Sequence, residues 1–318
     1  MITLATTKML YVDMAFNLAR SFFFWNRGAG IDFHLFTDVE FPVPRELLAM
    51  KVSRLPPGAL GTGFSPKLHL DKLAPAAQTM FIDADCLCVA PLGEVFDRFA
   101  GRAVSVVGDR VMTEGLWFGD VANICVRAGV KQLDGFNGGL YYLEPGPQAN
   151  QVYARAREIE KVYDDWGLVR LRGHANDELL MAIALAEAGL RAVPSDGTMM
   201  EPFNSYPEFR ELDVFAGRCV IANPPVGDKL HNSYSKVQVV HPRIPHFVDT
   251  FTDHWRYRSE VEKLRLYLGA GLPRWLARAV AFWTVALPGW TEVTFKKLLR
   301  PLYHALFGAR PIGINKRV

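Results

Sequence analysis

Two aspartates stand two positions apart at the end of an apolar run, in the stretch 79–87. Residues i and i+2 share one face of a strand, so the carboxylates of Asp83 and Asp85 can point at one ligand. Ligands of open α/β sheets bind beyond the carboxyl ends of the strands. Two carboxylates at such an edge suit a hard divalent cation, Mn²⁺ or Mg²⁺, and a cation held there can bind a diphosphate and stabilise its departure. The pair therefore predicts metal-dependent chemistry.

Two alternatives remain for this aspartate pair. Either carboxylate could cap a turn or pair with a lysine, although an apolar strand seldom ends in two acids for packing reasons. Phosphatases of the haloacid dehalogenase type also carry Asp-x-Asp after an apolar strand, with the first aspartate as nucleophile. Their pattern has Thr or Val two residues past the second aspartate and lies near the N-terminus, whereas this chain has Leu87 and a complete strand–helix–strand unit first. The phosphatase interpretation is kept as the alternative.

The elements that would position these residues alternate between strand and helix. Ile2–Thr6 is predicted as a buried strand, Met9–Trp25 as a helix with apolar residues at helical spacing, and Ile31–Thr37 as a second strand. A strand–helix–strand unit of this length implies a parallel sheet. Residues 79–89 are an apolar run, with a strand that ends at the aspartates. Further strands are predicted at 103–107, 140–143, 190–193, 219–222 and 237–240, helices at 67–73, 151–163 and 179–188, and an irregular crossover at 109–135. The fold class is thus α/β, with a mostly parallel central sheet flanked by helices.

The C-terminal part of the chain differs in charge and composition. Trp255–Val318 contains 12 Lys and Arg against 3 Asp and Glu, about +9, whereas the whole chain carries +3, which leaves about −6 for the rest. Its aromatic residues accompany the basic ones, a combination typical of a helix lying on an anionic membrane surface. A helical region that packs on the core or forms a homo-oligomer interface is the alternative. We expect a catalytic domain at 1–250 and a helical basic region at 251–318.

Composition limits the remaining classes. The 318 residues are 50% hydrophobic and 22% charged, which is ordinary for a globular protein. The four cysteines contain no Cys-x-x-Cys pair, so reduced thiols in a cytoplasmic protein are expected, with attachment to the cytoplasmic face of the membrane as a further expectation. Neither a secretory signal nor a spanning helix is predicted. The basic tail has no recognisable nucleic-acid-binding motif, and no nucleic-acid partner is expected.

Five segments resemble, in order, the retaining glycosyltransferase family that includes glycogenin and bacterial lipopolysaccharide galactosyltransferases. They cover about three-quarters of the chain. The segments are Thr6-Thr7 with Tyr11, Lys67-Leu68-His69 ahead of Phe81–Asp85, Phe136–Leu140, Asn176-Asp177-Glu178, and Val239-Val240-His241. The resemblance implies the GT-A fold of nucleotide-diphospho-sugar transferases.

The resemblance also implies where the donor nucleotide and the metal bind. Thr6, Thr7 and Tyr11 would line the nucleoside pocket, although Tyr11 could instead be a core aromatic residue. Lys67 would contact the phosphates or the sugar of the donor. Donor-binding and metal-binding positions implied around the aspartate pair are Asp83, Ala84, Asp85 and His241, with Asp83, Asp85 and His241 as the ligands of Mn²⁺ or Mg²⁺.

Two further segments would contact the donor sugar. Asn137 would hydrogen-bond the sugar near the reacting carbon, and Gly138 would allow close approach of the backbone. Asp177 would orient the sugar hydroxyls or face the anomeric carbon. The competing interpretations are a tight turn at 136–140 and a helix cap at Asn176 or Asp177. Lys67, Asn137 and Asp177 are the predicted catalytic residues.

The chain departs from the family pattern in three places. The family's His-x-x-Gly-x-x-Lys-Pro segment is replaced by His241-Pro242-Arg243-Ile244-Pro245-His246, so Arg243 is the candidate for the phosphate contact. His174 stands where relatives have an acid, and Glu178 where they have Gln. The expected function is transfer of a hexose from a UDP-sugar to a hydroxyl, with retention. A glycan, a protein hydroxyl, or a lipid-linked or lipopolysaccharide precursor could be the acceptor. A non-catalytic sugar-nucleotide binding protein is a second alternative.

Overall fold

A seven-stranded sheet forms the centre of the protein, whose computed structural model describes residues 1–233, 235 and 237–308. The strand order is β3-β2-β1-β4-β6-β5-β7, and four of the six pairings are parallel, with β6 antiparallel to both of its neighbours. The strands are β1 Ile2–Leu4, β2 His34–Thr37, β3 Lys51–Arg54, β4 Thr79–Ile82, β5 Val104–Met112, β6 Leu133–Leu143 and β7 Val193–Pro194. The predicted α/β class with a mostly parallel central sheet is confirmed.

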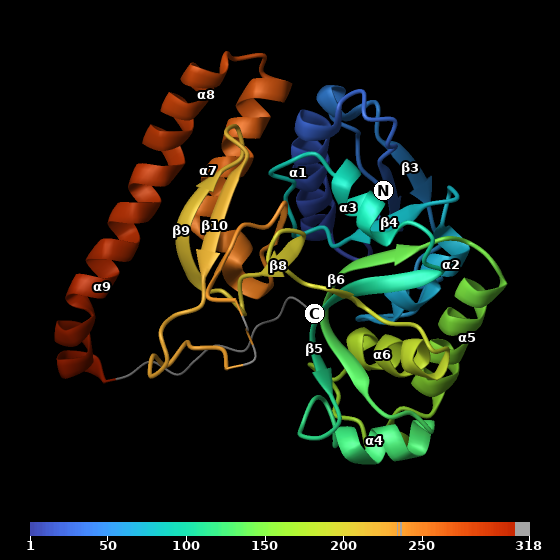
Figure 1. Cartoon of the computed structure of the whole chain (residues 1–318). Helices are drawn as coiled ribbons and strands as arrows, with labels where there is room; N and C mark the ends of the chain where they lie inside the picture. Colours follow the sequence, from blue (N-terminus) through green and yellow to red (C-terminus); the bar gives the residue numbers. More distant parts are fainter. Residues whose placement is uncertain (234, 236, 309–318) are drawn as a thin grey trace.

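Helices cover both faces of this sheet (Figure 1). They are α1 Met9–Asn26, α2 Leu70–Leu73, α3 Gly93–Phe99, α4 Val121–Ala128, α5 Pro147–Lys161 and α6 Asp177–Glu187, with helical turns η1 Arg45–Leu47, η2 Ser65–His69 and η3 Asp164–Trp166. Strand β4 shows the two faces directly, because successive side chains point to opposite sides of a strand. Met80 and Ile82 pack in the core that includes α1, whereas Phe81 packs in the core that includes α5 and α6. A strand buried on both faces explains why 79–82 reads as a continuous apolar run.

The crossover predicted as irregular is largely regular, and this prediction is wrong. Strand β5 continues to Met112, helix α4 follows, and β6 begins at Leu133. Local signals delimit α4: the Asp120 side chain accepts a hydrogen bond from the backbone N–H of Asn123, and Gly129 ends the helix at φ 66°. Strand β3 was also not predicted. It is short and lies at the edge of the sheet, so it does not need the continuous apolar residues that mark a strand buried on both faces.

Two smaller sheets follow the central one. Strands β9 Glu208–Asp213, β10 Arg218–Ala222 and β11 Val239–Val240 form an antiparallel sheet. Strands β8 Met200–Pro202 and β12 Ile244–His246 form a parallel pair. Strand β12 reaches the central sheet, because its last residue lies beside the segment that follows β4, as shown by the bridge between Cys86 and His246.

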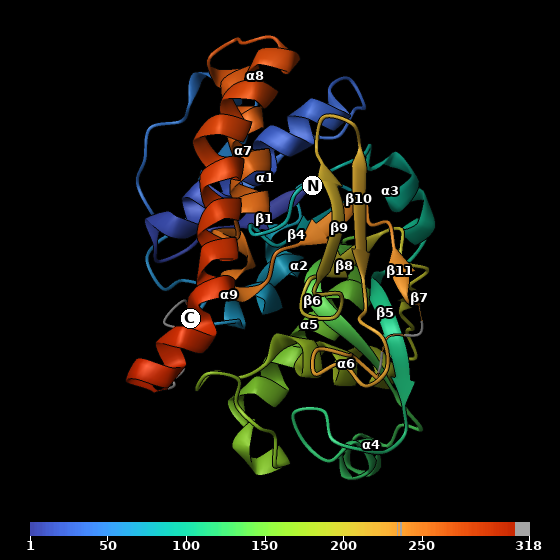
Figure 2. The ribbon, with the colours of Figure 1, turned by 90° about the vertical axis from the view of Figure 1, so that its left-hand side faces the viewer.

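The C-terminal helices begin on the body of the protein and then leave it. After η4 Asp249–Asp253 come α7 Trp255–Leu264, the π-helical turns η5 Arg265–Gly269 and η6 Phe282–Ala286, α8 Arg274–Ala281 and α9 Leu287–Phe307. A third core joins Tyr257 and Leu264 of α7 to Phe247 and the β9–β10 sheet, so buried contacts span the proposed boundary at 250, which stays a prediction. Helix α9 has no buried residue. Figures 1 and 2 show it continuing the line of α8 beside α7. Among the described helices, none is both long and apolar enough to cross a membrane.

Candidate functional site

The aspartate pair lies at the carboxyl edge of the central sheet. Asp83 directly follows β4, and its backbone N–H donates to the carbonyl of Gly139 on β6 at 3.0 Å. The chain then turns, with the N–H of Cys86 donating to the carbonyl of Asp83 at 3.0 Å. The N–H of Phe247, just past β12, donates to the carbonyl of Asp85 at 3.1 Å. Three separate chain segments are therefore joined by backbone hydrogen bonds around these carboxylates.

His246 stands at the centre of the site. Its Nε2 atom lies 3.0 Å from Oδ1 of Asp85 and 3.7 Å from Oδ2 of Asp83. Its other ring nitrogen, Nδ1, lies 2.7 Å from Oδ1 of Asn137, which also accepts a hydrogen bond from the N–H of Gly139 at 3.1 Å. The His246 side chain is 5% exposed. Because an amide oxygen only accepts, Nδ1 carries a proton; Nε2 can then bind a cation through its lone pair, or donate to Asp85 when the ring is doubly protonated.

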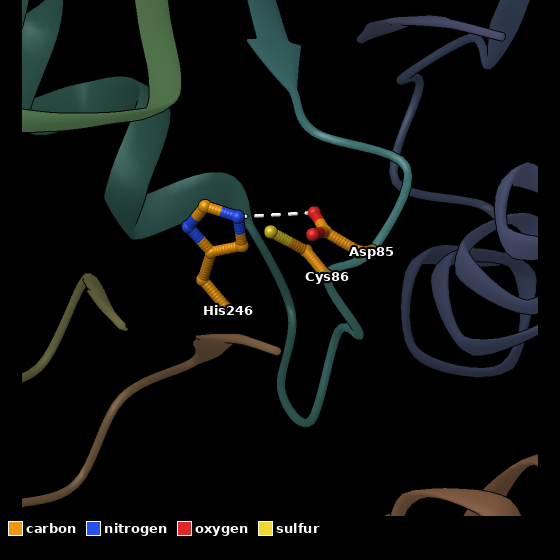
Figure 3. Close-up of side chains that lie close together, drawn as sticks. All are labelled: Asp85, Cys86 and His246. Atoms are coloured by element: carbon orange, nitrogen blue, oxygen red, sulfur yellow. Dashed lines mark ion pairs between the residues drawn. The ribbon is translucent and has the colours of Figure 1, made fainter. Parts of the chain in front are cut away.

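The predicted histidine ligand, His241, is not part of this cluster. His241 follows β11 as an exposed residue, whose backbone N–H donates to the carbonyl of Gly197. Among the described residues, the group of His, Cys, Asp or Glu ligand atoms within 4.8 Å of one another consists of Asp85, Cys86 and His246 (Figure 3). The histidine beside the aspartates is thus His246, five residues past the predicted His241. His241 follows β11 and His246 ends β12, and it is β12 that pairs with the segment after β4.

Lys67 connects the aspartate pair to the start of α6. Its Nζ atom, presented by η2, donates to Oδ2 of Asp83 at 2.7 Å and to the carbonyl of Gly138 at 2.9 Å, and lies 3.7 Å from Oδ2 of Asp177. The side chain is 15% exposed. Lys67 therefore neutralises part of the charge of two carboxylates that come from different elements.

Asp177 is the first residue of α6 and is buried. Its Oδ2 atom accepts a hydrogen bond from the hydroxyl of Tyr141 at 2.6 Å. The helix cap is Asn176, whose side chain accepts from the N–H of Leu179 at 3.2 Å. Because Asn176 caps the helix, the Asp177 carboxylate is not used as the cap and can serve the site. The two predicted roles, helix cap and site residue, therefore fall on two neighbouring residues.

Two glycines of β6 make room for these side chains. A Cβ atom at Gly138 would lie 2.8 Å from Oδ2 of Asp177, and one at Gly139 would overlap the imidazole of His246. The N–H of Gly138 donates to Oε1 of Glu178 at 2.8 Å. The glycines are thus required by close packing between β6, α6 and β12.

Burial and charge shift the ionisation of the cluster. Burial raises the pKa of Asp83, which also faces Asp85. Burial also raises the pKa of Asp85, but His246, together with Lys67 and a backbone hydrogen bond, holds that pKa below its usual value. Conversely, burial lowers the pKa of His246, and Asp85 raises it above its ordinary value. The carboxylates Asp83, Asp85 and Asp177 outnumber the lysine at the site, so the cluster favours a cation.

Glu178 is a further acidic residue beside Asp177 at the start of α6. Burial and the neighbouring Asp177 raise its pKa to about 7. Sequence reasoning noted Glu178 as a departure from the family but gave it no role, and it did not identify Tyr141, Cys86 or His246. A local signal existed for His246, which follows the apolar residues of β12 as Asp83 follows those of β4.

The predicted nucleoside-binding residues lie at the same sheet edge. Strands β1 and β4 pair in parallel, so Thr6 and Thr7 after β1 and Asp83 after β4 share one edge. Thr7 has φ 70°, and its N–H donates to Oδ1 of Asp38 at 2.7 Å. Tyr11 lies in the first turn of α1, partly exposed. These placements are compatible with a pocket beside the aspartates, and the nucleoside role stays a prediction.

Arg243 is held away from the aspartates. Its guanidinium pairs with Glu94 of α3 and donates to the carbonyl of Pro91 at 3.3 Å. The N–H of Val89 donates to the carbonyl of Arg243, three residues before His246 reaches the site. The predicted phosphate contact through Arg243 therefore has no support in this geometry.

The donor set fits a divalent cation. Carboxylate oxygens from Asp83 and Asp85 and the Nε2 atom of His246 converge from two segments, and Asn137 fixes the ring orientation as partners of ligating histidines do. Carboxylate oxygens are suited to Mn²⁺ and Mg²⁺, and the imidazole nitrogen is also a good ligand of zinc.

Comparison with known proteins identifies the fold. The chain is similar to the galactosyltransferase LgtC solved in complex with donor and acceptor sugar analogs, with a TM-score of 0.51 and 12% sequence identity over 86% of this chain and 96% of that one. It is also similar to an active-site mutant of LgtC, with a TM-score of 0.50 and 13% identity over 78% and 87% of the two chains. No family model and no curated protein sequence matches the chain. The chain thus has the fold of a GT-A glycosyltransferase.

Proposed function

We propose that the protein is a metal-dependent glycosyltransferase that moves a hexose from a UDP-sugar to a hydroxyl acceptor, with retention at the anomeric carbon. The observation that carries this proposal is the convergence of Lys67, Asp83, Asp85, Asp177 and His246 from four separate segments at the carboxyl edge of the sheet. The fold shared with LgtC supports the same class. Retention rests on the family resemblance alone.

The residues of the site divide into two groups in this proposal. Asp83, Asp85 and His246 would hold Mn²⁺ or Mg²⁺, which when bound neutralises a diphosphate leaving group. Lys67, already in contact with Asp83 and close to Asp177, would move toward the phosphates or the sugar and supply positive charge there.

Asn137 and Asp177 have different tasks. Asn137 orients the imidazole of His246 through Nδ1, so its first role is to hold a proposed metal-binding side chain in place. Any contact of Asn137 with the sugar would be additional. Asp177 is fixed by Tyr141 and would orient the donor sugar at the mouth of the site. As a nucleophile or as a group that only positions the donor, Asp177 would act through its carboxylate.

The acceptor side of the proposal includes an anionic membrane surface. Helix α9 exposes large apolar residues while carrying no buried residue. These are Trp290, Val293, Phe295, Leu298, Leu299, Leu302, Leu306 and Phe307, which are 49% to 72% exposed. Lys296, Lys297 and Arg300 lie on the same helix, and such a mixture is typical of helices at a lipid interface. A lipid-linked glycan or lipopolysaccharide precursor at the cytoplasmic face would then be within reach.

A donor screen tests the proposal. Purified protein is incubated with UDP-sugars and GDP-sugars in the presence of Mn²⁺, and release of the nucleotide diphosphate is measured. We expect slow release from one UDP-hexose, lost on chelation and reduced at least about 100-fold in Asp85→Asn. Binding of the nucleotide sugar without any release, also with candidate acceptors, would favour a non-catalytic binding protein. Release of phosphate from simple phosphomonoesters would favour the phosphatase alternative.

A further inference from the structure

The thiol of Cys86 belongs to the same cluster as the proposed metal ligands. Its Sγ atom, a carboxylate oxygen of Asp85 and a ring nitrogen of His246 lie within 4.8 Å of one another. Figure 3 shows the thiol and the carboxylate turned toward the imidazole. The bridge pairing of Cys86 with His246 and the hydrogen bond from Phe247 to the Asp85 carbonyl fix all three on adjoining backbone. The grouping therefore follows from the main chain.

Asp83 lies outside this group, and its Oδ2 atom is 3.7 Å from Nε2 of His246. Lys67 donates to its Oδ2 atom at 2.7 Å, so part of its charge is already balanced. Asp85, Cys86 and His246 then offer one oxygen, one sulfur and one nitrogen within 4.8 Å of one another. Three protein ligands with a fourth position open is the arrangement of catalytic zinc sites, in which a water or substrate atom completes the tetrahedron.

The thiol changes which cations the site prefers. Magnesium takes oxygen ligands and does not gain from sulfur, whereas Zn²⁺, Co²⁺ and Cd²⁺ bind thiolate and imidazole well. We propose that Asp85, Cys86 and His246 form a thiolate-containing site for a zinc-like divalent cation, which competes there with Mn²⁺ or Mg²⁺. This inference rests on the proposed function only in placing a divalent cation at this corner of the sheet.

Without a cation the thiol is protonated. Burial and the carboxylates of Asp85 and Asp83 raise the pKa of Cys86 well above its ordinary value. A divalent cation reverses the sign of the local charge, and a coordinating thiol then loses its proton. On binding, a metal–sulfur bond forms and the thiol proton passes to solvent, so no oxidant or further reactant is needed.

Cobalt spectroscopy tests the site without any sugar nucleotide. The full-length, metal-free protein is titrated with Co²⁺, and a sulfur-to-cobalt charge-transfer band is sought in the near ultraviolet. We expect one band that saturates at one equivalent and is displaced by Zn²⁺. The band should be lost in Cys86→Ser and kept in the matched control Cys88→Ser, since Cys88 is equally buried two residues further along. Zinc affinity should fall at least about 100-fold in Cys86→Ser, because even partners that only orient a ligand cost about 10- to 100-fold.

Zinc X-ray absorption of the wild-type protein covers the case in which Cys86→Ser does not fold. The expected first shell contains one sulfur at about 2.3 Å beside nitrogen and oxygen. A shell of nitrogen and oxygen alone, or a cobalt band that survives in folded Cys86→Ser, would overturn the thiolate site. Neither result affects Mn²⁺-dependent nucleotide release, so the failure of this inference and the failure of the proposed function remain distinguishable.

Discussion

The amide oxygen of Asn137 lies 2.7 Å from Nδ1 of His246, and this contact turns the opposite ring nitrogen toward Asp85. A residue on the long strand β6 thereby sets the orientation of a residue at the end of β12, more than one hundred positions away. Such outer partners raise the affinity of a metal site by fixing the tautomer and the direction of the ring.

Asn137→Ala should lower Mn²⁺ affinity by about 10- to 100-fold, because the His246 ring loses its fixed orientation. Isothermal titration with Mn²⁺ measures this loss, and circular dichroism checks that the fold is kept. Unchanged affinity in a folded variant would mean that the contact does not serve the metal.

His246→Gln and His241→Gln form a matched pair. The first variant should lose most of its Mn²⁺ affinity and metal-dependent nucleotide release, whereas the second should retain both, because His241 is exposed and lies outside the cluster. The same titration and release assays compare the two. If His241→Gln were the more damaging change, the assignment of His246 would be wrong.

Lys67→Met should both destabilise the protein and reduce nucleotide release. It leaves the carboxylates of Asp83 and Asp177 without their cation at side-chain exposures of 20% and 4%, and we expect a loss of about 2–4 kcal/mol in the free energy of unfolding. Urea unfolding measures the change. The double variant Lys67→Met/Asp83→Asn should recover part of the stability and none of the activity; full additivity of the two changes would show that the side chains do not interact.

Glu178→Gln should remove a pH dependence near neutrality. The pKa of Glu178 is raised to about 7 from 4.5, so the folded state holds a proton that the unfolded chain loses first. The stability associated with this proton is present in full below about pH 4.5 and falls as the pH rises to about 7. Above pH 7 the variant should therefore be more stable than the wild type by about 1–3 kcal/mol.

Urea unfolding of both proteins at pH 5 and pH 8 measures this effect. The difference between variant and wild type should be larger at pH 8. An equal difference at the two pH values would show that Glu178 does not titrate in this range.

Reversing the charge of the exposed tail should weaken membrane binding. Lys296, Lys297 and Arg300 changed together to Glu should release the full-length protein from vesicles containing phosphatidylserine by at least about 10-fold, since each basic residue near an anionic surface contributes about 1 kcal/mol. Cosedimentation measures the bound fraction. Lys72, Lys131 and Lys229 changed to Glu make the same charge difference on other exposed positions and should bind as the wild type does.

Equal binding of both triple variants, or no binding of the wild type, would contradict the membrane proposal. A concentration-dependent change in mass in the Lys296/Lys297/Arg300 variant would instead point to an oligomer interface on α9.

Local pattern was sufficient for the aspartate pair and for the elements that carry most of the site. A continuous apolar run, apolar residues at helical spacing and a helix-capping residue can each be recognised within a short stretch of sequence. The elements β1, α1, β4 and α6 could therefore be predicted from neighbouring residues. Their order along the chain also determined the α/β class.

Only the tertiary structure decided which histidine joins the aspartates. His241 follows β11 and His246 ends β12, and local sequence does not say which strand passes beside the segment after β4. The bridge between Cys86 and His246 settles that choice, and it also brings the thiol into the cluster. The positions of Asn137 and Arg243 depend likewise on long-range partners. Pairing between distant segments is set by the packing of the whole sheet, which no short window of residues contains.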